Sequence, residues 1–265
     1  MAHKISRYGW LPDLPDQRDL VYLAPRPLLA KLPAKADLRK QCPLVYDQGQ
    51  LGSCTANAIG AAFEFGLLRQ SQAKDFMPSR LFIYYNEREI EHSVNSDSGA
   101  MIRDGMKTVN KQGVCPENMW PYNIEMFANE PSPNCYTNAL NHQVLSYHRV
   151  TRNLNQMKSC LADGYPFVFG FTVYESFEAA TVAKTGKLNM PKKGEATVGG
   201  HAVMAVGYDG ASKRFIVRNS WGTSWGLSGY FTMPFDYLME GNLSDDFWTI
   251  RLVELNPVQL RKKKK

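Results

Sequence analysis

The sequence predicts an α+β fold in which a mostly helical first half is followed by a mostly β second half. Up to about residue 113, apolar residues recur at helical spacing, whereas β-branched and aromatic residues gather in short runs from residue 143 onward. The 265 residues, 44% of them hydrophobic, fit one large domain or two small ones that share a core. We therefore expect two lobes, and the interface between them is a natural place for a cleft.

Three helices are expected in the first half. One begins at Cys54, where a polar, glycine-bearing loop gives way to small and apolar residues. A second covers 78–91 and has a proline at its start, and a third runs from about 101 to 110. Four prolines within residues 113–141 predict a long irregular connection to the second half.

The second half is expected to be rich in strands. The segment 167–174 is the clearest, because nearly all of its residues are β-branched or aromatic. Further strands are expected at 143–150, 202–208, 214–219, 230–233 and 247–253, and a short helix at 154–162.

The N-terminal segment differs in character from both halves. Residues 1–35 carry five prolines, with Trp10, Tyr22 and other apolar side chains between them. Proline at this density disfavours regular helix and favours an extended backbone. We expect an arm packed on the globular body, with a disordered leader as the alternative. The first ten residues lack the apolar core of a secretory signal, so retention in the cell, export by a route without such a signal, and a signal already removed all stay open.

The net charge of +6 is partly local, because Arg261 to Lys265 supply five positive charges at the C-terminus. A solvated, disordered tail is the simplest interpretation, and a nucleic-acid or membrane anchor is the alternative. The rest of the chain is close to neutral, which argues against nucleic-acid binding. No run of about 18 apolar residues predicts a transmembrane helix.

The chain has five cysteines, so at least one lacks an intramolecular disulfide partner. None belongs to a CxxC pair, which disfavours a structural zinc site. Cys115 and Cys135 flank the proline-rich connection and could form a disulfide, whereas the pairing of Cys42 and Cys160 is open.

Three stretches carry a pattern of nucleophilic catalysis. Cys54 begins a helix, whose N-terminal N–H groups favour a thiolate, although a small buried core residue is the simpler interpretation for one cysteine. His201 opens an apolar strand after two glycines, and Asn219 ends another strand before a loop with two tryptophans. Each of these three residues, taken alone, is best interpreted as structural. Together they supply a thiol, a base and a group that orients the base, which are the parts of a nucleophilic site.

The residues around these positions resemble the papain family of cysteine peptidases, which includes the cathepsins. The resemblance rests on Gln48 six residues before the cysteine, on Gly52-Ser53-Cys54, on Gly200-His201-Ala202, and on the run from Asn219 to Tyr230. It covers roughly residues 33–253 and is most specific in the last stretch. It implies a two-lobed papain-like fold with a helical lobe, a β-barrel-like lobe and the active-site cleft between them.

The resemblance also implies roles. Cys54 would attack the peptide carbonyl as a thiolate paired with imidazolium, and His201 would act as acid and base. Asn219 would orient the histidine, Gln48 and the Cys54 N–H would hold the oxyanion, and Trp221 would shield the site. The implied chemistry uses no cofactor.

The resemblance also implies which residues contact the substrate. Ser98 and Gly99 resemble the family's glycine strip, which pairs with substrate backbone. Ala100, Met101, Gly199 and Ala202 would line the pocket for the second residue before the scissile bond. These residues are small or apolar and uncharged, so an apolar side chain is the expected preference.

Departures from the family pattern are informative. Leu51 stands where most members carry a disulfide cysteine, and the usual partner region 95–99 also lacks cysteine, so that bridge is absent. Thr55 replaces a tryptophan, and Gly200 replaces a frequent aspartate. The pattern is typical of a microbial branch of the family.

We therefore expect an arm at residues 1–32 that acts as a short pro-segment, a peptidase domain at 33–255 with lobes at about 36–141 and 142–255, and a basic tail at 256–265. The expected activity is that of a monomeric cysteine endopeptidase acting on peptides or proteins. The alternatives are an exopeptidase, a peptide-binding homologue that no longer cleaves, and a nucleic-acid-binding protein that uses the basic tail.

Overall fold

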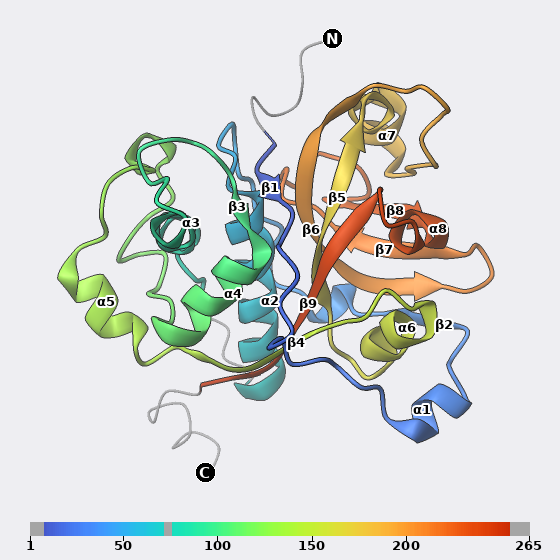
Figure 1. Ribbon diagram of the computed structural model, residues 1–265, viewed down its shortest axis with the longest axis horizontal. Coiled ribbons are helices and arrows are strands. Elements are labelled where there is room, and N and C mark those ends of the chain that lie inside the picture. Colours follow the sequence, from blue (N-terminus) through green and yellow to red (C-terminus); the bar gives the residue numbers. More distant parts are fainter. Residues whose placement is uncertain (1–7, 72–75, 255–265) are drawn as a thin grey trace.

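The computed structural model describes residues 8–71 and 76–254, which form two lobes with an arm between them (Figure 1). The helical lobe contains α2 (Cys54–Ser71), α3 (Arg80–Ile90), α4 (Ile102–Lys111) and α5 (Pro133–Ala139), with the short strand β3 (Ala100–Met101). The predicted α+β class and the three predicted helices of this lobe are confirmed. The basic tail lies outside the described residues.

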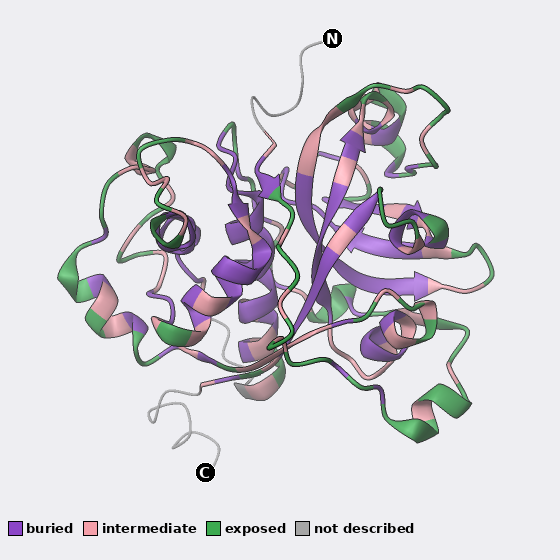
Figure 2. Cartoon of the chain, in the orientation of Figure 1, coloured by how far each residue is buried: buried purple, intermediate pink, exposed green. Residues whose placement is uncertain are grey.

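Helix α2 lies at the centre of the molecule and contacts strands of the β lobe (Figures 1 and 2). Its first ten residues are all buried, and small residues such as Ala56 and Ala58 allow neighbouring elements to approach closely. A helix that is buried on every side belongs to the interior of a domain. The first residue of α2 is therefore fixed relative to both lobes.

The β lobe is built on one antiparallel sheet of seven strands. Its strands are β2 (Lys35–Asp37), β4 (Val144–Arg149), β5 (Phe167–Tyr174), β6 (Thr197–Asp209), β7 (Arg214–Arg218), β8 (Tyr230–Pro234) and β9 (Ser244–Val253). The order is β4-β9-β5-β6-β7-β8, with β2 beside β6. Because β4 and β8 end this order without pairing to each other, the expected barrel-like lobe is an open sheet.

Short helices cover and connect the strands. They are α6 (Leu154–Ala162), α7 (Ala180–Thr185) and α8 (Phe235–Met239), with the 3₁₀ turns η1 (Arg39–Gln41) and η3 (Glu175–Glu178). A further 3₁₀ turn, η2 (Ile124–Met126), lies between α4 and α5. Helix α6 begins where predicted, because the Asn153 side chain accepts hydrogen bonds from the N–H groups of Asn155 and Gln156.

Two proline-rich segments contain helices that the sequence analysis did not expect. The connection 113–141 includes η2 and α5, and the arm includes α1 (Arg26–Ala30). Both α1 and α5 have a proline within their first two positions. Proline is tolerated there because the missing N–H would lack an intrahelical partner anyway. The number of prolines alone therefore did not exclude helix in these segments, because the position of each proline decides whether a helix can form.

The suggested disulfide between Cys115 and Cys135 is not formed, because all five cysteines carry free thiols. The two side chains are nevertheless neighbours: burial raises the pKa of the Cys115 thiol, and the adjacent Cys135 adds to that rise. Within the described residues, no helix combines the length and apolar character needed to cross a membrane.

The arm runs down the junction of the two lobes (Figure 1). Its strand β1 (Trp10–Leu11) pairs in parallel with β3, and Tyr22 N–H donates to the Arg149 carbonyl at 2.8 Å. Trp10 and Tyr22 are buried, so these apolar side chains belong to the core. Ion pairs join Asp19 of the arm to Arg103 of α4 and to Arg149 of β4.

The packing of the sheet core predicts which substitutions destabilise the protein most. Phe169 of β5 is fully buried and packs against Phe167, Phe171 and Phe247. Phe169→Ala should lower the free energy of unfolding by about 3–5 kcal/mol in a denaturant titration, because it leaves a cavity. The control Leu145→Ala, at a side chain that is 53% exposed, should cost much less. Equal losses would contradict this placement of the core.

Candidate active site

Three elements bring the predicted triad together at the lobe junction. Cys54 is the first residue of α2, His201 lies on β6, and Asn219 directly follows β7. All three are buried. His201 Nε2 and Asn219 Oδ1 are 2.8 Å apart, which fixes the imidazole ring. His201 Nδ1 has no hydrogen-bond partner within the described residues, so this nitrogen is left to meet another atom.

An aromatic enclosure surrounds the histidine. The Trp221 ring lies with its centroid 5.1 Å from that of His201, and Phe171 and Phe177 approach from β5 and η3. Trp221 is itself only 1% exposed. The enclosure excludes water from the hydrogen bond between His201 and Asn219, which strengthens that bond.

Gln48 lies in the loop before α2 and joins the two lobes. Its Oε1 accepts from Ser220 Oγ at 2.6 Å, and its Nε2 donates to the Leu51 carbonyl at 2.9 Å. The Gln48 N–H also donates to the Ser220 carbonyl at 2.9 Å. One amide hydrogen of Nε2 is therefore used inside the loop, and the second is available to another acceptor.

The thiol of Cys54 lies against backbone from both sides of the junction. Burial raises the pKa of the thiol to about 12, opposed by hydrogen bonds from the backbone of Ala202 and of Gly9. Burial likewise lowers the pKa of His201 to about 4, although the bond to Asn219 works against that shift. In this covered site, burial thus favours the neutral form of each group.

Burial in this covered site thus works against the thiolate–imidazolium pair that the resemblance implied. Two separated charges in a water-free enclosure would each lose their hydration. The arm adds to this cover, since the Tyr8 ring stands edge-on to His201 with centroids 5.8 Å apart. Exposure of the site to water would remove the main cause of both pKa shifts.

Two hydrogen bonds hold the loop before α2 and the start of α2, where the family pattern has a disulfide and a tryptophan. Asp97 accepts from the Gly52 N–H at 3.0 Å and from the Tyr84 hydroxyl, and so ties the loop before α2 to the segment 95–99 where a disulfide is missing. Thr55 donates to the buried carboxyl of Glu87 at 2.5 Å. Burial holds the pKa of the Glu87 carboxyl well above its ordinary value.

Comparison with known families decides what this arrangement belongs to. Residues 32–244 match the family described as papain family cysteine protease. The chain belongs to this family. It is therefore a cysteine peptidase, also called a thiol protease, and the predicted recognition is confirmed.

Relatives of this papain-family chain include microbial and viral proteins. It is 45% identical to a peptidase C1-like protein of Acanthamoeba polyphaga mimivirus, over 94% of this chain and 88% of that protein. It is 28% identical to cysteine proteinase 3 of Entamoeba histolytica, over 77% of this chain but only 63% of that longer protein.

Solved structures of the family agree. Xylellain, a cysteine protease from Xylella fastidiosa, superposes with a TM-score of 0.87 at 45% identity, covering 95% of this chain and 98% of that one. Procathepsin B of Trypanosoma congolense shares the fold, with a TM-score of 0.72 at 17% identity over 93% of this chain and 86% of that one.

The arm occupies the surfaces on which substrate contacts were predicted. The Ala100 N–H donates to the Gly9 carbonyl at 2.8 Å, and Gly9 passes close to both Gly52 and Gly99. Tyr8 lies against Gly199. Of the other predicted residues, Met101 pairs with Leu11, Ala202 lies at the thiol, and Ser98 hydrogen-bonds to Ser93.

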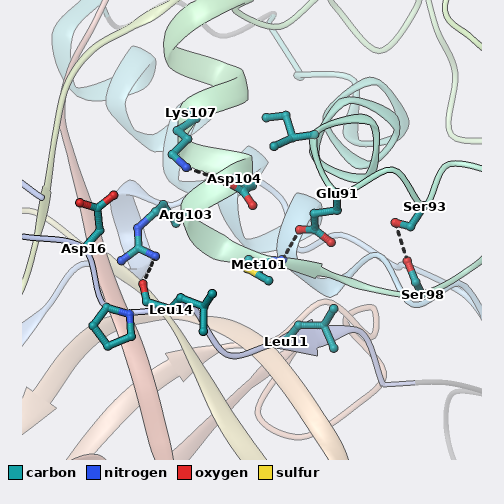
Figure 3. A pocket seen from close by; sticks show the side chains of 12 residues that line it. Leu11, Leu14, Asp16, Glu91, Ser93, Ser98, Met101, Arg103, Asp104 and Lys107 are labelled. Carbon is teal, nitrogen blue, oxygen red and sulfur yellow. Dashed lines mark hydrogen bonds and ion pairs between the residues drawn. The ribbon is translucent and has the colours of Figure 1, made fainter. Parts of the chain in front are cut away.

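A cavity of about 560 Å³ opens beside the arm rather than at Cys54 (Figure 3). Leu11 and Leu14 of the arm form one side, and Met101 and Arg103 of the helical lobe form another. The arm thus divides the junction: it fills the space over the cysteine and leaves a hollow along the helical lobe.

Sequence patterns did not identify the arm residues that reach the site, nor Asp97 and Glu87. The dense prolines signalled an extended arm but not its path. Asp97 had a weak signal, since it lies in the segment whose cysteine is absent. Glu87 had none, because its partner Thr55 is distant in sequence.

The covered site predicts a specific pH dependence of thiol reactivity. Only the thiolate reacts with iodoacetamide, so alkylation of Cys54 in the intact chain should be slow at pH 7. Its rate should rise about tenfold per pH unit from 7 to 9 without a plateau, because the pKa of about 12 lies above that window. Peptide mapping by mass spectrometry separates Cys54 from the other cysteines. A pH-independent rate already reached at pH 7 would show an ion pair instead.

Proposed function

We propose that the protein is a cysteine endopeptidase in which Cys54 is the nucleophile and His201 the acid and base. The observation that carries the proposal is the hydrogen bond of 2.8 Å between His201 Nε2 and Asn219 Oδ1, which leaves Nδ1 unpaired beside the helix that starts with the cysteine. A base held at one nitrogen and open at the other is the arrangement that thiol activation requires.

The reaction runs in two halves. His201 takes the proton of the Cys54 thiol, and the sulfur attacks the peptide carbonyl to form a C–S bond and a tetrahedral oxyanion. The imidazolium then gives its proton to the leaving amine as the C–N bond breaks. Water, deprotonated by His201, hydrolyses the thioester and restores the thiol.

The oxyanion would be held by the Gln48 amide and the Cys54 N–H. Gln48 supports this role because Ser220 and the Leu51 carbonyl fix its side chain before substrate arrives. The N–H of Cys54 belongs to the first turn of α2, where it lacks an intrahelical acceptor. Donors that are already oriented stabilise the developing charge without reorganisation.

Activity variants test these roles. Cys54→Ala should abolish the appearance of internal fragments from a denatured protein substrate, because no thioester can form. Gln48→Ala should lower kcat about 10²–10³-fold, the usual cost of one oxyanion donor. Leu44→Ala, at a side chain 88% exposed, serves as the control and should leave kcat unchanged. Full activity of Cys54→Ala would exclude the proposed chemistry.

We further propose that the arm, residues 1–32, restrains the enzyme as a short pro-segment. Tyr8 covers His201, Gly9 hydrogen-bonds to the thiol, and β1 occupies the backbone groups of β3. A substrate and the arm would compete for the same atoms. Prolines lower the entropy that the arm loses on docking.

Gly9 offers a clean way to test the restraint. A methyl group added there would stand 1.7 Å from the Gly52 carbonyl oxygen, so Gly9→Ala should displace the arm from Cys54. We expect at least tenfold faster hydrolysis of small peptides. Leu23→Ala, also in the arm but 80% exposed, is the matched control and should behave as wild type. Unchanged hydrolysis by a folded Gly9→Ala protein would refute the restraint.

A further inference from the structure

Arg80, the first residue of α3, lies against the loop that precedes α2. It is only 7% exposed, although arginine is seldom buried unless it is paired. Its guanidinium carbon lies 4.0 Å from the centroid of the Tyr122 ring and 4.9 Å from that of the Tyr46 ring. Because a planar cation packed on aromatic faces has little freedom to turn, the orientation of this guanidinium is fixed.

The Arg80 guanidinium connects the two ends of this loop. Its Nη1 donates to the carbonyl of Asp47, the residue before the glutamine, at 3.2 Å. The same nitrogen donates to Asn57 Oδ1 at 3.3 Å. Asn57 Nδ2 in turn donates at 2.9 Å to the carbonyl of Ser53, the residue before the cysteine. One guanidinium nitrogen therefore joins the two backbone positions that precede the two predicted oxyanion donors.

Tyr122 makes a second connection across the same loop. Its hydroxyl donates to the Gln48 carbonyl at 3.0 Å and also hydrogen-bonds to the Ser53 hydroxyl. Glu117 Oε1 accepts from the Tyr122 N–H at 3.1 Å and from Arg80 Nη2 at 2.7 Å, so one carboxylate holds the tyrosine and the arginine together. We call Arg80, Tyr122 and Glu117 the loop clamp.

The direction of these hydrogen bonds distinguishes the loop clamp from a purely stabilising ion pair. A buried ion pair is by itself weak evidence of any role, because desolvation of the two charges offsets their attraction. Here the donors of Arg80 and Tyr122 also reach the backbone on both sides of the predicted oxyanion site. Such a site needs both of its donors within about 2.7–3.1 Å of one oxygen atom. A displacement of about 1 Å in a catalytic group can cost about 10²-fold in rate.

From this geometry we infer that Arg80 is a positioning residue for peptide hydrolysis, because it sets the separation between the Gln48 amide and the Cys54 N–H. The inference rests on the proposed function, in which these two groups hold the oxyanion. Arg80 acts through the loop and does not touch the reacting atoms. Because the oxyanion exists only after attack on the carbonyl, loss of the clamp lowers kcat and leaves KM nearly unchanged.

Arg80→Lys tests the inference in the full chain carrying Gly9→Ala. Lysine keeps a positive charge beside Glu117, but its single ammonium lacks the planar fork that also reaches Asp47 and Asn57. We expect kcat for a peptide substrate to fall about tenfold or more, with KM within about twofold of the parent value. An unchanged kcat in the folded variant would overturn the inference.

A matched control is Arg214→Lys in the same chain. Arg214 of β7 also donates to two backbone carbonyls, those of Leu188 and Thr232, but these lie in the β lobe. Its replacement should leave kcat unchanged. An equal fall of kcat in both lysine variants would show a general cost of losing a guanidinium and would overturn the inference.

Alkylation of Cys54 separates positioning from general loosening of the site. Iodoacetamide forms a C–S bond and releases iodide without an oxyanion, so Arg80→Lys should leave this rate within about twofold of the parent. Tyr122→Phe provides a second, milder variant, since it keeps the ring under the guanidinium and removes only the hydroxyl. It should also lower kcat while sparing KM and alkylation. Parallel losses of kcat and alkylation in both variants would overturn the inference.

A double-mutant cycle with Gln48→Ala distinguishes failure of this inference from failure of the proposed function. Once the glutamine donor is gone, no separation is left to set, so adding Arg80→Lys should lower kcat by less than about twofold more. Losses that multiply would show that Arg80 acts elsewhere and would overturn the inference alone. Undiminished kcat in Gln48→Ala by itself would refute the proposed oxyanion site, and this inference with it.

Discussion

The hydrogen bonds between Gln48 and Ser220 are the constraint on which the site depends. They cross from the loop before α2 to the loop after β7, at 2.9 Å through the backbone and at 2.6 Å through the side chains. A further bond joins the Gly222 N–H to the Tyr46 carbonyl at 3.0 Å. Because Asn219 and Trp221 flank Ser220, these hydrogen bonds position the predicted oxyanion donor and the groups that hold His201.

The same contact between the lobes explains why burial is the main cause of the pKa shifts of Cys54 and His201. The cysteine and histidine come from different lobes, so they meet only where the lobes close on each other. The arm completes that closure with Tyr8, Gly9 and Trp10, and burial favours the neutral form of each enclosed group. In the proposed restraint, the arm both covers the thiol and favours its neutral, less nucleophilic form.

Local sequence patterns predicted much of this structure. The bounds of α6 and β5 agreed with prediction. A dense run of β-branched and aromatic residues marks β5 in the sequence. Family motifs pointed to Cys54, His201, Asn219 and Gln48, and the catalytic roles of these residues stay predictions. Helix α5 was missed because proline at a helix start resembles a loop signal.

The hydrogen bond that the Trp10 ring donates to Asp246 could not have been predicted in the same way. Trp10 and Asp246 are 236 residues apart, and neither belongs to a periodic pattern that pairs them. Gly170 interrupts a strand of large residues, which signals a close approach but does not identify the Trp10 ring as the partner. Only the fold brings Trp10 and Asp246 to one place. The tie between Asp97 and Gly52 was hidden for the same reason.

Reaction with an epoxysuccinyl peptide tests the central claim, a competent cysteine site that the arm covers, most directly. Such a reagent needs both an accessible cleft and an activated thiol. The account predicts one covalent adduct per chain, located on Cys54, that forms readily in Gly9→Ala and slowly in wild type. It also predicts no adduct when His201→Ala is added. An adduct on another cysteine, or equal rates in wild type and Gly9→Ala, would contradict it.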